Sequence, residues 1–378
     1  MSIDIVQVNT AKQMRQFVRF YDALYKDTWQ YVPPLHNGEK KFYDKEQNKS
    51  HSYCDSVCFL AYKDGKVVGR IGGILNHRYN EKVDRKQLRF TTFDFIDDLE
   101  VSKALLETLG EWGLAKGMEE FNGPIGFTDF DRQGMLVEGF DKPGMYITNY
   151  NYSYYPEHMA KLGFETDVEW QEFLVKTPTT VHPRHAKIAK RMRELGYHIV
   201  RFDSNKEFNN VVYEAFEVYN AAFAKLHGVV PLTKEQIKMY VDDYIGLINR
   251  DYVIIVRDTK ERIVAFALLA GSLYEAARKA KGHLFPFGWV SIVKAFKRPK
   301  ECLDMYWIAV LPELQGLGIP SLILEEVASK MIRDGIKWAE TGPQLVDNLP
   351  VMSLWDDFEY EIVRRRRCYQ RKIREEVS

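Results

Sequence analysis

The sequence lacks an excess of either charge and lacks a long apolar run, and each absence excludes a class of protein. The 378 residues carry 53 basic and 53 acidic side chains. Broad capture of nucleic acid needs a basic surface, so we expect no nucleic-acid partner. The longest apolar stretch covers residues 263–273, which is shorter than the roughly 20 residues of a membrane-spanning helix. We therefore expect no transmembrane span.

Cysteine is also scarce. The four cysteines, at positions 54, 58, 302 and 368, form neither paired CxxC units nor a dense disulfide framework. The first ten residues, MSIDIVQVNT, contain no basic segment followed by an apolar one, so no signal peptide is expected. Both observations favour a cytoplasmic protein with reduced cysteines.

What the sequence contains is a faint internal repeat. Hydrophobic residues make up 46% of the chain, enough for two domain cores. Each copy predicts a β-hairpin, an insertion, a third strand and a helix that stops at a glycine. In the first copy these elements are residues 57–75, 90–96 and 99–116. In the second copy they are residues 252–270, 303–310 and 320–334.

Each copy continues with two more strands. They are residues 119–121 and 170–176 in the first copy, and 336–340 and 362–369 in the second. This order predicts an α/β (α+β) chain of two tandem domains, each with a mixed, largely antiparallel sheet flanked by helices. The turn-rich stretch at 177–180 favours domains at 1–178 and 179–378.

The strongest motif lies in the second copy, between the third strand and its helix. The chain reads Val-Leu-Pro-Glu-Leu-Gln-Gly-Leu-Gly-Ile-Pro from 310 to 320. Glycines let a backbone approach a ligand, and the first N–H groups of a helix have no internal partner. With the helix dipole these groups favour a phosphate. Pro320 suits the first helical turn.

This motif resembles the acyl-CoA loop of the GNAT superfamily of acyltransferases. The family pattern is Gln or Arg, two residues, Gly, one residue, then Gly or Ala. Gln315 and Gly318 match it, Gly316 is a common filler, and Pro320 departs from the last position. The resemblance implies acetyl-CoA or a longer acyl-CoA as donor substrate. Its pyrophosphate would lie on the loop residues Gln315, Gly316, Leu317, Gly318, Ile319 and Pro320.

The resemblance also implies roles for the preceding strand and for a later segment. The backbone N–H groups of Ile308 and Val310 would bind pantetheine or polarise the thioester carbonyl. Asn348 fits the asparagine that contacts CoA. The family's acid tyrosine stands seven positions on, where this chain has Trp355, whose indole is no proton donor of useful pKa. Tyr360 or Tyr369 would then serve, or the thiolate leaves unassisted.

Amine acylation also needs a base, because an ammonium group cannot attack a thioester. A carboxylate near the strand ends serves directly or through a water. Glu340 is the first candidate and Asp304 the second. Solvated charges at strand ends are the alternative reading for both. No metal site is expected.

The first copy lacks the loop. Its equivalent segment contains no glycine and carries Asp97, Asp98 and Glu100 where phosphates would lie. Asp97 or Asp98 suits a helix N-cap, but each carboxylate would repel a pyrophosphate. We interpret the first domain as a GNAT-like support that shapes the acceptor site.

Three further segments invite alternative interpretations. The insertion at 271–300 is apolar and basic. It would cover an acyl chain, touch a membrane surface, or pack as an ordinary helix between the domains. The tyrosine-rich run 149–155 lines a pocket or belongs to the core. Arg364 to Arg367 lie on a predicted strand, and the alternation of side chains places two of them on each face. We expect them to pair with acidic neighbours or to be solvated, and not to bind phosphate. Cys368 has no evident His partner and is not expected to be a nucleophile.

The sequence therefore predicts an N-acyltransferase that moves an acyl group from acyl-CoA to a primary amine of a small molecule or amino acid. A Fem-type aminoacyltransferase is one alternative, although no helical hairpin for tRNA is evident. A non-catalytic acyl-CoA-binding or scaffold protein is the other.

Overall fold

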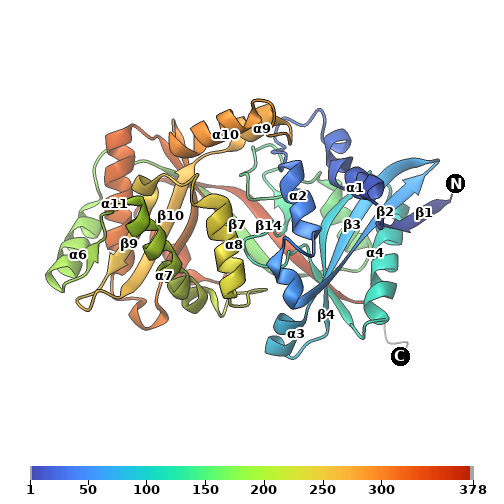
Figure 1. The fold of residues 1–378 in the computed structure, drawn as a ribbon, viewed down its shortest axis with the longest axis horizontal. Helices are drawn as coiled ribbons and strands as arrows, with labels where there is room; N and C mark the ends of the chain where they lie inside the picture. The colour runs from blue at the N-terminus through green and yellow to red at the C-terminus, as the bar shows by residue number, and fades with distance from the viewer. Residues whose placement is uncertain (1, 375–378) are drawn as a thin grey trace. The chain divides into compact units, whose positions relative to one another are not determined.

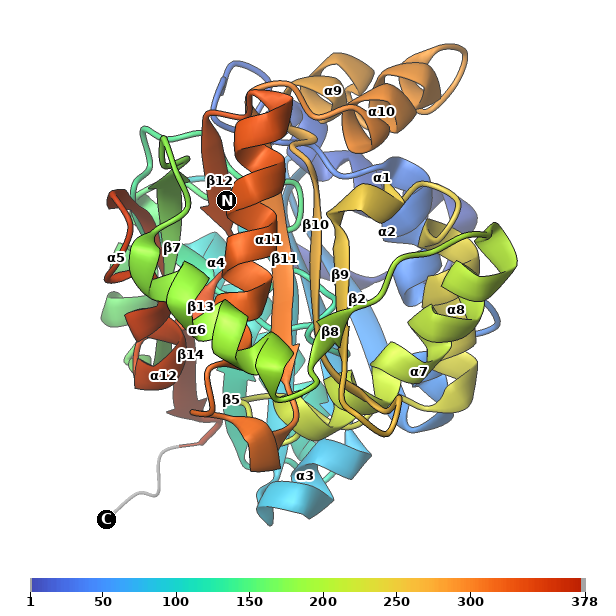
Figure 2. The same cartoon turned by 90° about the vertical axis from the view of Figure 1, so that its left-hand side faces the viewer.

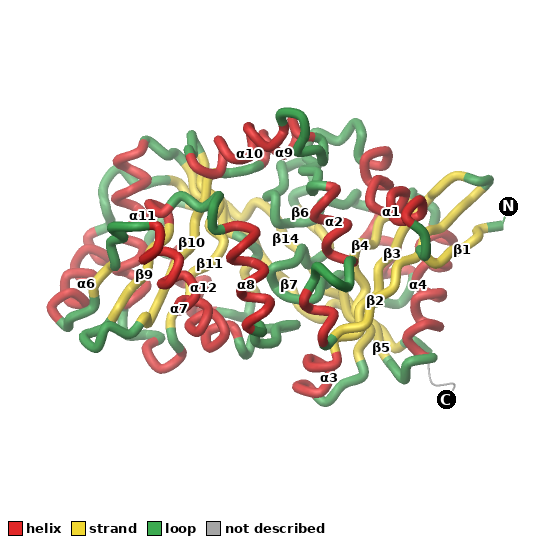
Figure 3. The backbone as a smooth tube through the Cα atoms, viewed as in Figure 1, coloured by secondary structure: helices red, strands yellow, loops and turns green. Residues whose placement is uncertain are grey.

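The computed structural model describes residues 2–374, which divide into two compact units. Within the described residues, unit 1 comprises 2–170, 277–286 and 364–374, and unit 2 comprises 171–276 and 287–363. No helix in the described part of the chain has both the length and the apolar character needed to cross a membrane. Figure 3 shows the helices, strands and loops of the described chain.

Unit 1 is built on a sheet with helices packed against it (Figure 1). Its strands are β1 (Ile3–Gln7), β2 (Cys54–Lys63), β3 (Lys66–Asn76), β4 (Gln87–Phe95), β5 (Glu120–Gly123) and β6 (Met135–Glu138). Its helices are α1 (Ala11–Leu24), α2 (His36–Tyr43), α3 (His77–Val83), α4 (Leu99–Leu114) and α5 (Tyr154–Lys161), with a 3₁₀ turn at Lys49–Ser52.

The sheet of unit 1 runs β1-β2-β3-β4-β5-β14, where β14 is Tyr360–Lys372. All neighbours are antiparallel except β4 and β5, which are parallel. The apolar face of α4, with Val101, Leu105 and Leu109 fully buried, packs into the core against the sheet. Asp98 caps α4 by accepting a hydrogen bond from the N–H of Glu100 at 3.1 Å, which confirms the predicted N-cap.

Unit 2 repeats this plan (Figure 2). Its strands include β8 (His198–Ile199), β9 (Val253–Arg257), β10 (Ile263–Gly271), β11 (Cys302–Val310), β12 (Trp338–Thr341) and β13 (Gln344–Leu345). Its helices are α6 (Pro183–Glu194), α7 (Asn205–Phe223), α8 (Lys234–Tyr244), α10 (Gly288–Lys297), α11 (Ile319–Asp334) and α12 (Leu349–Met352). The 3₁₀ turns are η2 (Arg250–Tyr252), η3 (Pro312–Leu314) and η4 (Ser353–Trp355), and α9 (Tyr274–Ala280) has residues in both units.

The sheet of unit 2 runs β8-β9-β10-β11-β12-β7, where β7 is Glu165–Lys176. Here too one neighbouring pair, β11 and β12, is parallel and the others are antiparallel. The strand order of the two sheets is therefore the same, as the internal repeat predicted. Each is a mixed, largely antiparallel sheet flanked by helices.

The last strand of each sheet comes from the other half of the chain. Residues 174–176 of β7, predicted as the end of the first domain, pair with β12 in unit 2. Residues 369–372 of β14, predicted as the end of the second, pair with β5 in unit 1. The compact units are thus not consecutive ranges that meet at residue 178. Strand periodicity is local, whereas the choice of partner strand is made by the tertiary fold.

The arginine run on β14 alternates as predicted. Arg364 and Arg366 are buried, at 2% and 0% exposure, and donate to backbone carbonyls of unit 1. Arg365 and Arg367 lie on the other face and each donate to Glu169 at 2.8 Å. The four arginines therefore have a structural role, since their hydrogen bonds hold β14 against neighbouring segments.

The cysteines are free thiols, and three of them, Cys54, Cys58 and Cys368, are buried. Burial raises the pKa of the Cys54 thiol to about 12 and that of the Cys368 thiol well above its ordinary value. A thiol held protonated is a poor nucleophile, in agreement with the sequence interpretation of Cys368.

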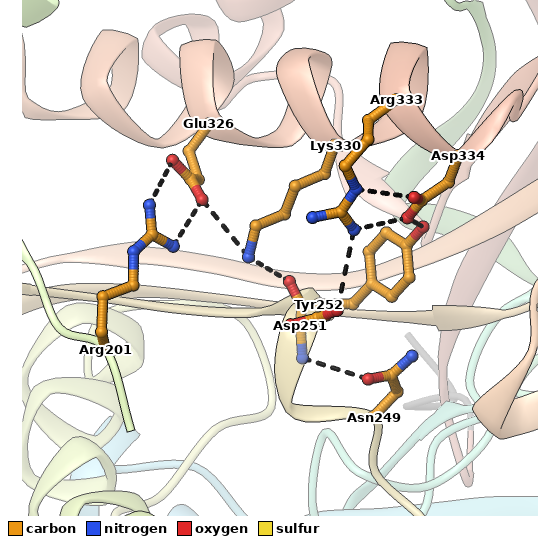
Figure 4. A network of polar contacts seen from close by, with 8 residues as sticks. All are labelled: Arg201, Asn249, Asp251, Tyr252, Glu326, Lys330, Arg333 and Asp334. Carbon is orange, nitrogen blue, oxygen red and sulfur yellow. Dashed lines mark hydrogen bonds and ion pairs between the residues drawn. The ribbon is translucent and has the colours of Figure 1, made fainter. Parts of the chain in front are cut away.

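A polar network ties α11 to the segments before β9 within unit 2 (Figure 4). Glu326 accepts two hydrogen bonds from Arg201, at 2.6 and 3.0 Å, and pairs with Lys330 at 3.3 Å. Burial raises the pKa of Glu326, but the Arg201 hydrogen bond and the Lys330 charge outweigh it and leave that pKa below its usual value. At the C-terminal end of the helix, Tyr252 donates to Asp334 at 2.6 Å.

Candidate functional site

Strands β11 and β12 part in the middle of the sheet of unit 2. Their parallel ladder runs from Cys302↔Trp338 to Met305↔Thr341, and Gly342 N–H donates to Met305 O at 3.0 Å. Beyond this point β12 has ended, whereas β11 continues to Val310, paired on its other side with β10. The second half of β11 therefore has a partner strand on one edge and an open edge on the other.

Two backbone donors point to this open edge. Leu311 N–H donates to Val264 O of β10 at 2.9 Å. Because successive N–H groups of a strand point to opposite edges, those of Ile308 and Val310 are directed away from β10. Within the described part of unit 2, no side chain accepts a hydrogen bond from either group. Both N–H groups therefore face the edge of β11 at which no strand pairs.

The loop after β11 is fixed at both ends and exposed in its middle. Gln315 Nε2 donates to Val310 O at 3.2 Å, which holds the loop against the strand end. Gly316 and Gly318 have φ of +80° and +97°, a region that glycine adopts without strain. Leu317 between them is 53% exposed.

Gly318 is also required for packing. A Cβ at this position would lie 2.6 Å from Cγ2 of Ile188 on α6, whereas one at Gly316 would have no atom within 4 Å. Gly318 is the N-cap of α11 and supplies no side chain to its first N–H groups. Ile319 is fully buried and Pro320 occupies the first turn, as predicted. The positive end of a 16-residue helix is therefore left to solvent or to an anion.

Asp304 and Glu340 are opposite each other in the β11–β12 ladder. Asp304 is fully buried and Glu340 half-buried, and with Cys302 they bring one donor atom each within 4.8 Å. These three groups could hold a metal ion. Both predicted base candidates thus lie together, at the point where the two strands part.

Tyr306 is a further site residue, which the sequence did not single out. Leu268 and Leu269 of β10 pair with Trp307 and Met305, so Tyr306 is the extra residue of a β-bulge. Its hydroxyl lies 3.5 Å from Oδ2 of Asp304. Nothing in the local pattern of this strand signals a bulge, because its position depends on the pairing with β10.

The remaining predicted residues are dispersed. Asn348 is the N-cap of α12 and makes no side-chain cap. Trp355 is buried, and its Nε1 donates to Gln344 Oε1 at 2.8 Å, so it has a core role in place of the family's acid. Tyr360 is 42% exposed and its ring meets Phe173 edge-on.

Tyr369 does not lie in unit 2. It is paired with Gly123 in unit 1, and burial raises the pKa of its phenol. The structure therefore does not bring this tyrosine into the unit that carries the loop.

Unit 1 has the same parting of strands, but there it is filled. Its β4–β5 ladder ends at Arg89↔Asn122, and β4 continues to Phe95. The Phe95 N–H, equivalent to that of Val310, donates to the hydroxyl of Tyr155 at 3.0 Å, and the two rings stack at 4.2 Å. The tyrosine-rich run is thus core in part. Unit 1 provides an internal comparison in which a side chain occupies the open edge.

No family model matches the chain. The chain is similar to Protein YghO of Escherichia coli strain K12, with 24% identity over 368 residues that cover 95% of this chain and 93% of that protein. It is also similar to the bacterial ceramide synthase of Caulobacter vibrioides, with 21% identity over 296 residues, or 78% and 77% of the two chains.

Among solved structures, the fold resembles the tandem GNAT protein from the clavulanic acid biosynthesis pathway, determined without AcCoA. The TM-score is 0.57 at 11% identity, and the match covers 99% of this chain and 100% of that one. The chain therefore has a tandem GNAT fold, and the predicted mixed α/β class is confirmed.

Proposed function

We propose that the protein is an acyl-CoA-dependent N-acyltransferase whose donor site lies along β11 in unit 2. The observation that carries the proposal is the contrast between the two units. The same strand edge is closed by Tyr155 in unit 1 and left open in unit 2, where it leads directly into the glycine loop and the N-terminus of α11. One edge thus offers donors to a carbonyl and, further on, donors to a phosphate.

The residues present fit an acyl-CoA. The N–H groups of Ile308 and Val310 would donate to pantetheine or the thioester carbonyl. Gln315, Gly316, Leu317, Gly318, Ile319 and Pro320 would surround the pyrophosphate. Three carboxylates replace the loop in unit 1, which supports the assignment of the donor site to the second unit.

Acyl transfer then needs a free amine. Asp304 lies four residues before Ile308 on β11, about 13 Å along the strand, and Glu340 lies opposite Asp304 on β12. The proton of the ammonium would therefore pass to them through water. The amine nitrogen attacks the carbonyl carbon and the C–N bond forms. The C–S bond then breaks, and the departing thiolate takes up the second proton that the nitrogen loses as the amide forms. The N–H groups stabilise the charge that develops on the carbonyl oxygen.

The acceptor class proposed is a primary amine of a small molecule or amino acid. The relative named bacterial ceramide synthase favours the inclusion of long-chain amino alcohols, since ceramides are their N-acyl derivatives. A scaffold that binds acyl-CoA without turnover, and a Fem-type enzyme, are the alternative outcomes.

Two measurements test the proposal. Thermal melts with CoA, acetyl-CoA and palmitoyl-CoA should show stabilisation of about 2.7 kcal/mol at 100 times the dissociation constant. Release of the CoA thiol is then followed across a panel of amines. A shift with turnover supports the enzyme, a shift without turnover on any amine favours the scaffold, and no shift with any of the three ligands contradicts a CoA site.

A further inference from the structure

The segment from 276 to 300 is strongly basic in a chain of zero net charge. It contains seven lysines and arginines and no aspartate or glutamate. They are Arg278, Lys279, Lys281, Lys294, Lys297, Arg298 and Lys300. The last four belong to unit 2, follow or form the end of α10, and none of them makes an ion pair within the described residues. We refer to Lys294, Lys297, Arg298 and Lys300 as the cation cluster; in the part of the chain that the structure describes, it has no acidic side chain in ion-pair contact.

Helix α10 has an inner and an outer face. Ile292 and Phe296 are buried, at 6% and 9% exposure, and the ring of Phe296 stacks on Tyr306 at 6.4 Å. These contacts fix the helix on unit 2. Trp289 and Val290, by contrast, remain 47% and 45% exposed. Part of the apolar surface of α10 is therefore not buried within unit 2.

The outer face combines apolar and cationic side chains in one line. Phe287, Val290, Lys294 and Lys297 follow each other at spacings of three, four and three residues, which places them on one side of the helix. Phe287 at the N-terminal end is 77% exposed. Apolar residues therefore occupy the first half of this face and lysines the second.

We infer that this face docks on the surface of an anionic lipid bilayer. Exposed aromatic and aliphatic side chains bury themselves at the boundary between headgroups and acyl chains, and adjacent lysines lie at the level of anionic headgroups. An interfacial helix of this kind needs neither a transmembrane span nor a basic protein overall. The charge of the cluster is complementary to that surface, and Phe287, Trp289 and Val290 are 77%, 47% and 45% exposed.

Helix α10 is connected to the candidate site through β11. α10 directly precedes β11, and its Phe296 contacts Tyr306, whose hydroxyl is 3.5 Å from Asp304. The glycine loop follows the other end of β11, so the docking face and the proposed donor loop lie at opposite ends of one strand (Figure 2). Bilayer binding itself does not depend on the proposed function, and is measured without CoA or turnover.

The full-length protein is tested by flotation with vesicles of phosphatidylcholine, with and without phosphatidylglycerol. Binding should be at least about tenfold tighter to the anionic vesicles and should weaken at high salt. The double substitution Lys294→Glu/Lys297→Glu should lower it about tenfold or more. Lys206→Glu/Lys234→Glu is the matched control, because it changes the same net charge on exposed residues of α7 and α8.

A second pair of variants tests whether apolar contacts with the bilayer contribute to binding in addition to charge attraction. Phe287→Ser/Val290→Ser should also lower binding about tenfold, because the free energy gained by burying these apolar side chains in the bilayer interface is lost while the charge is unchanged. Leu195→Ser/Ile332→Ser removes two exposed apolar groups elsewhere in unit 2, at 54% and 37% exposure, and should leave binding unchanged. Unchanged melting temperatures of the four double variants verify that each remains folded.

Three results would overturn the inference. One is equal binding of the wild-type protein to neutral and anionic vesicles, or none to either. Another is a charge effect without an apolar effect, together with tight binding of duplex DNA, which would assign the cations to nucleic acid. The third is conversion of a dimer to a monomer by the apolar substitutions, which would assign the face to a second copy of the chain.

Discussion

A charge series at Leu317 separates the donor loop from the packing around it. Leu317 is 53% exposed and lies between two glycines of the loop, so its side chain can be exchanged without a change in the core. Gln, Glu and Lys at this position have similar length and differ in charge. A substitution at Gly318 is a poorer probe, because any side chain there also meets Ile188.

The expected magnitude follows from Coulomb's law. A carboxylate about 6 Å from one negative charge of a pyrophosphate is repelled by roughly 0.7 kcal/mol at a dielectric of 80 and roughly 3 kcal/mol at 20. Leu317→Glu should therefore weaken acyl-CoA binding by about 3-fold to 100-fold relative to Leu317→Gln, and Leu317→Lys should tighten it. High salt should shrink both differences, since the site is exposed.

The assay is isothermal titration of each variant with acetyl-CoA at two salt concentrations, with melts to confirm equal stability. Pantetheine, which lacks the pyrophosphate, serves as the control ligand and should bind all three variants alike. Equal acetyl-CoA affinity of the Gln, Glu and Lys variants would refute the placement of the pyrophosphate on this loop.

Three further predictions concern other parts of unit 2. Gly318→Ala should cost about 2 to 4 kcal/mol of unfolding free energy and Gly316→Ala about 1, as measured by urea denaturation, because the former adds a packing conflict to the backbone strain; equal costs would contradict the packing at Gly318. Asp304→Asn and Glu340→Gln should each lower turnover by about 100-fold or more with the dissociation constant of acyl-CoA unchanged, and full turnover in both would remove the base role. Glu326, whose pKa is lowered in the folded protein, stabilises the fold above its ordinary pKa, and this contribution is lost as pH falls through the folded value. The stability deficit of Glu326→Gln should therefore be largest near neutral pH and vanish in acid, and a deficit that grows in acid would contradict that sign.

Local pattern was sufficient for the elements and for the loop. The hairpins, the helices that end near Gly117 and Gly335, and the turn at 315–318 depend on periodicity and on residues with particular backbone preferences. The strand β11, its loop and helix α11 occur where the sequence predicted them. The alternation of four arginines on β14 was likewise a property of strand geometry alone.

The sequence alone did not predict which strands pair with each other. Residues 170–176 and 362–369 were correctly predicted as strands, but each completes the sheet opposite to the one expected. The bulge at Tyr306 and the core position of Trp355 depend on contacts with β10, and with Gln344 and Phe173, that are distant along the chain. No period in a single strand encodes them.

The sequence by itself determined which segments form strands and helices, and where the glycine loop before α11 lies, because these follow from short-range sterics and hydrogen bonding. Only the tertiary structure decided which strand edge stays open. The same parting of strands occurs in both units, and it is the Tyr155 hydroxyl, brought to Phe95 from 60 residues away, that closes one of them.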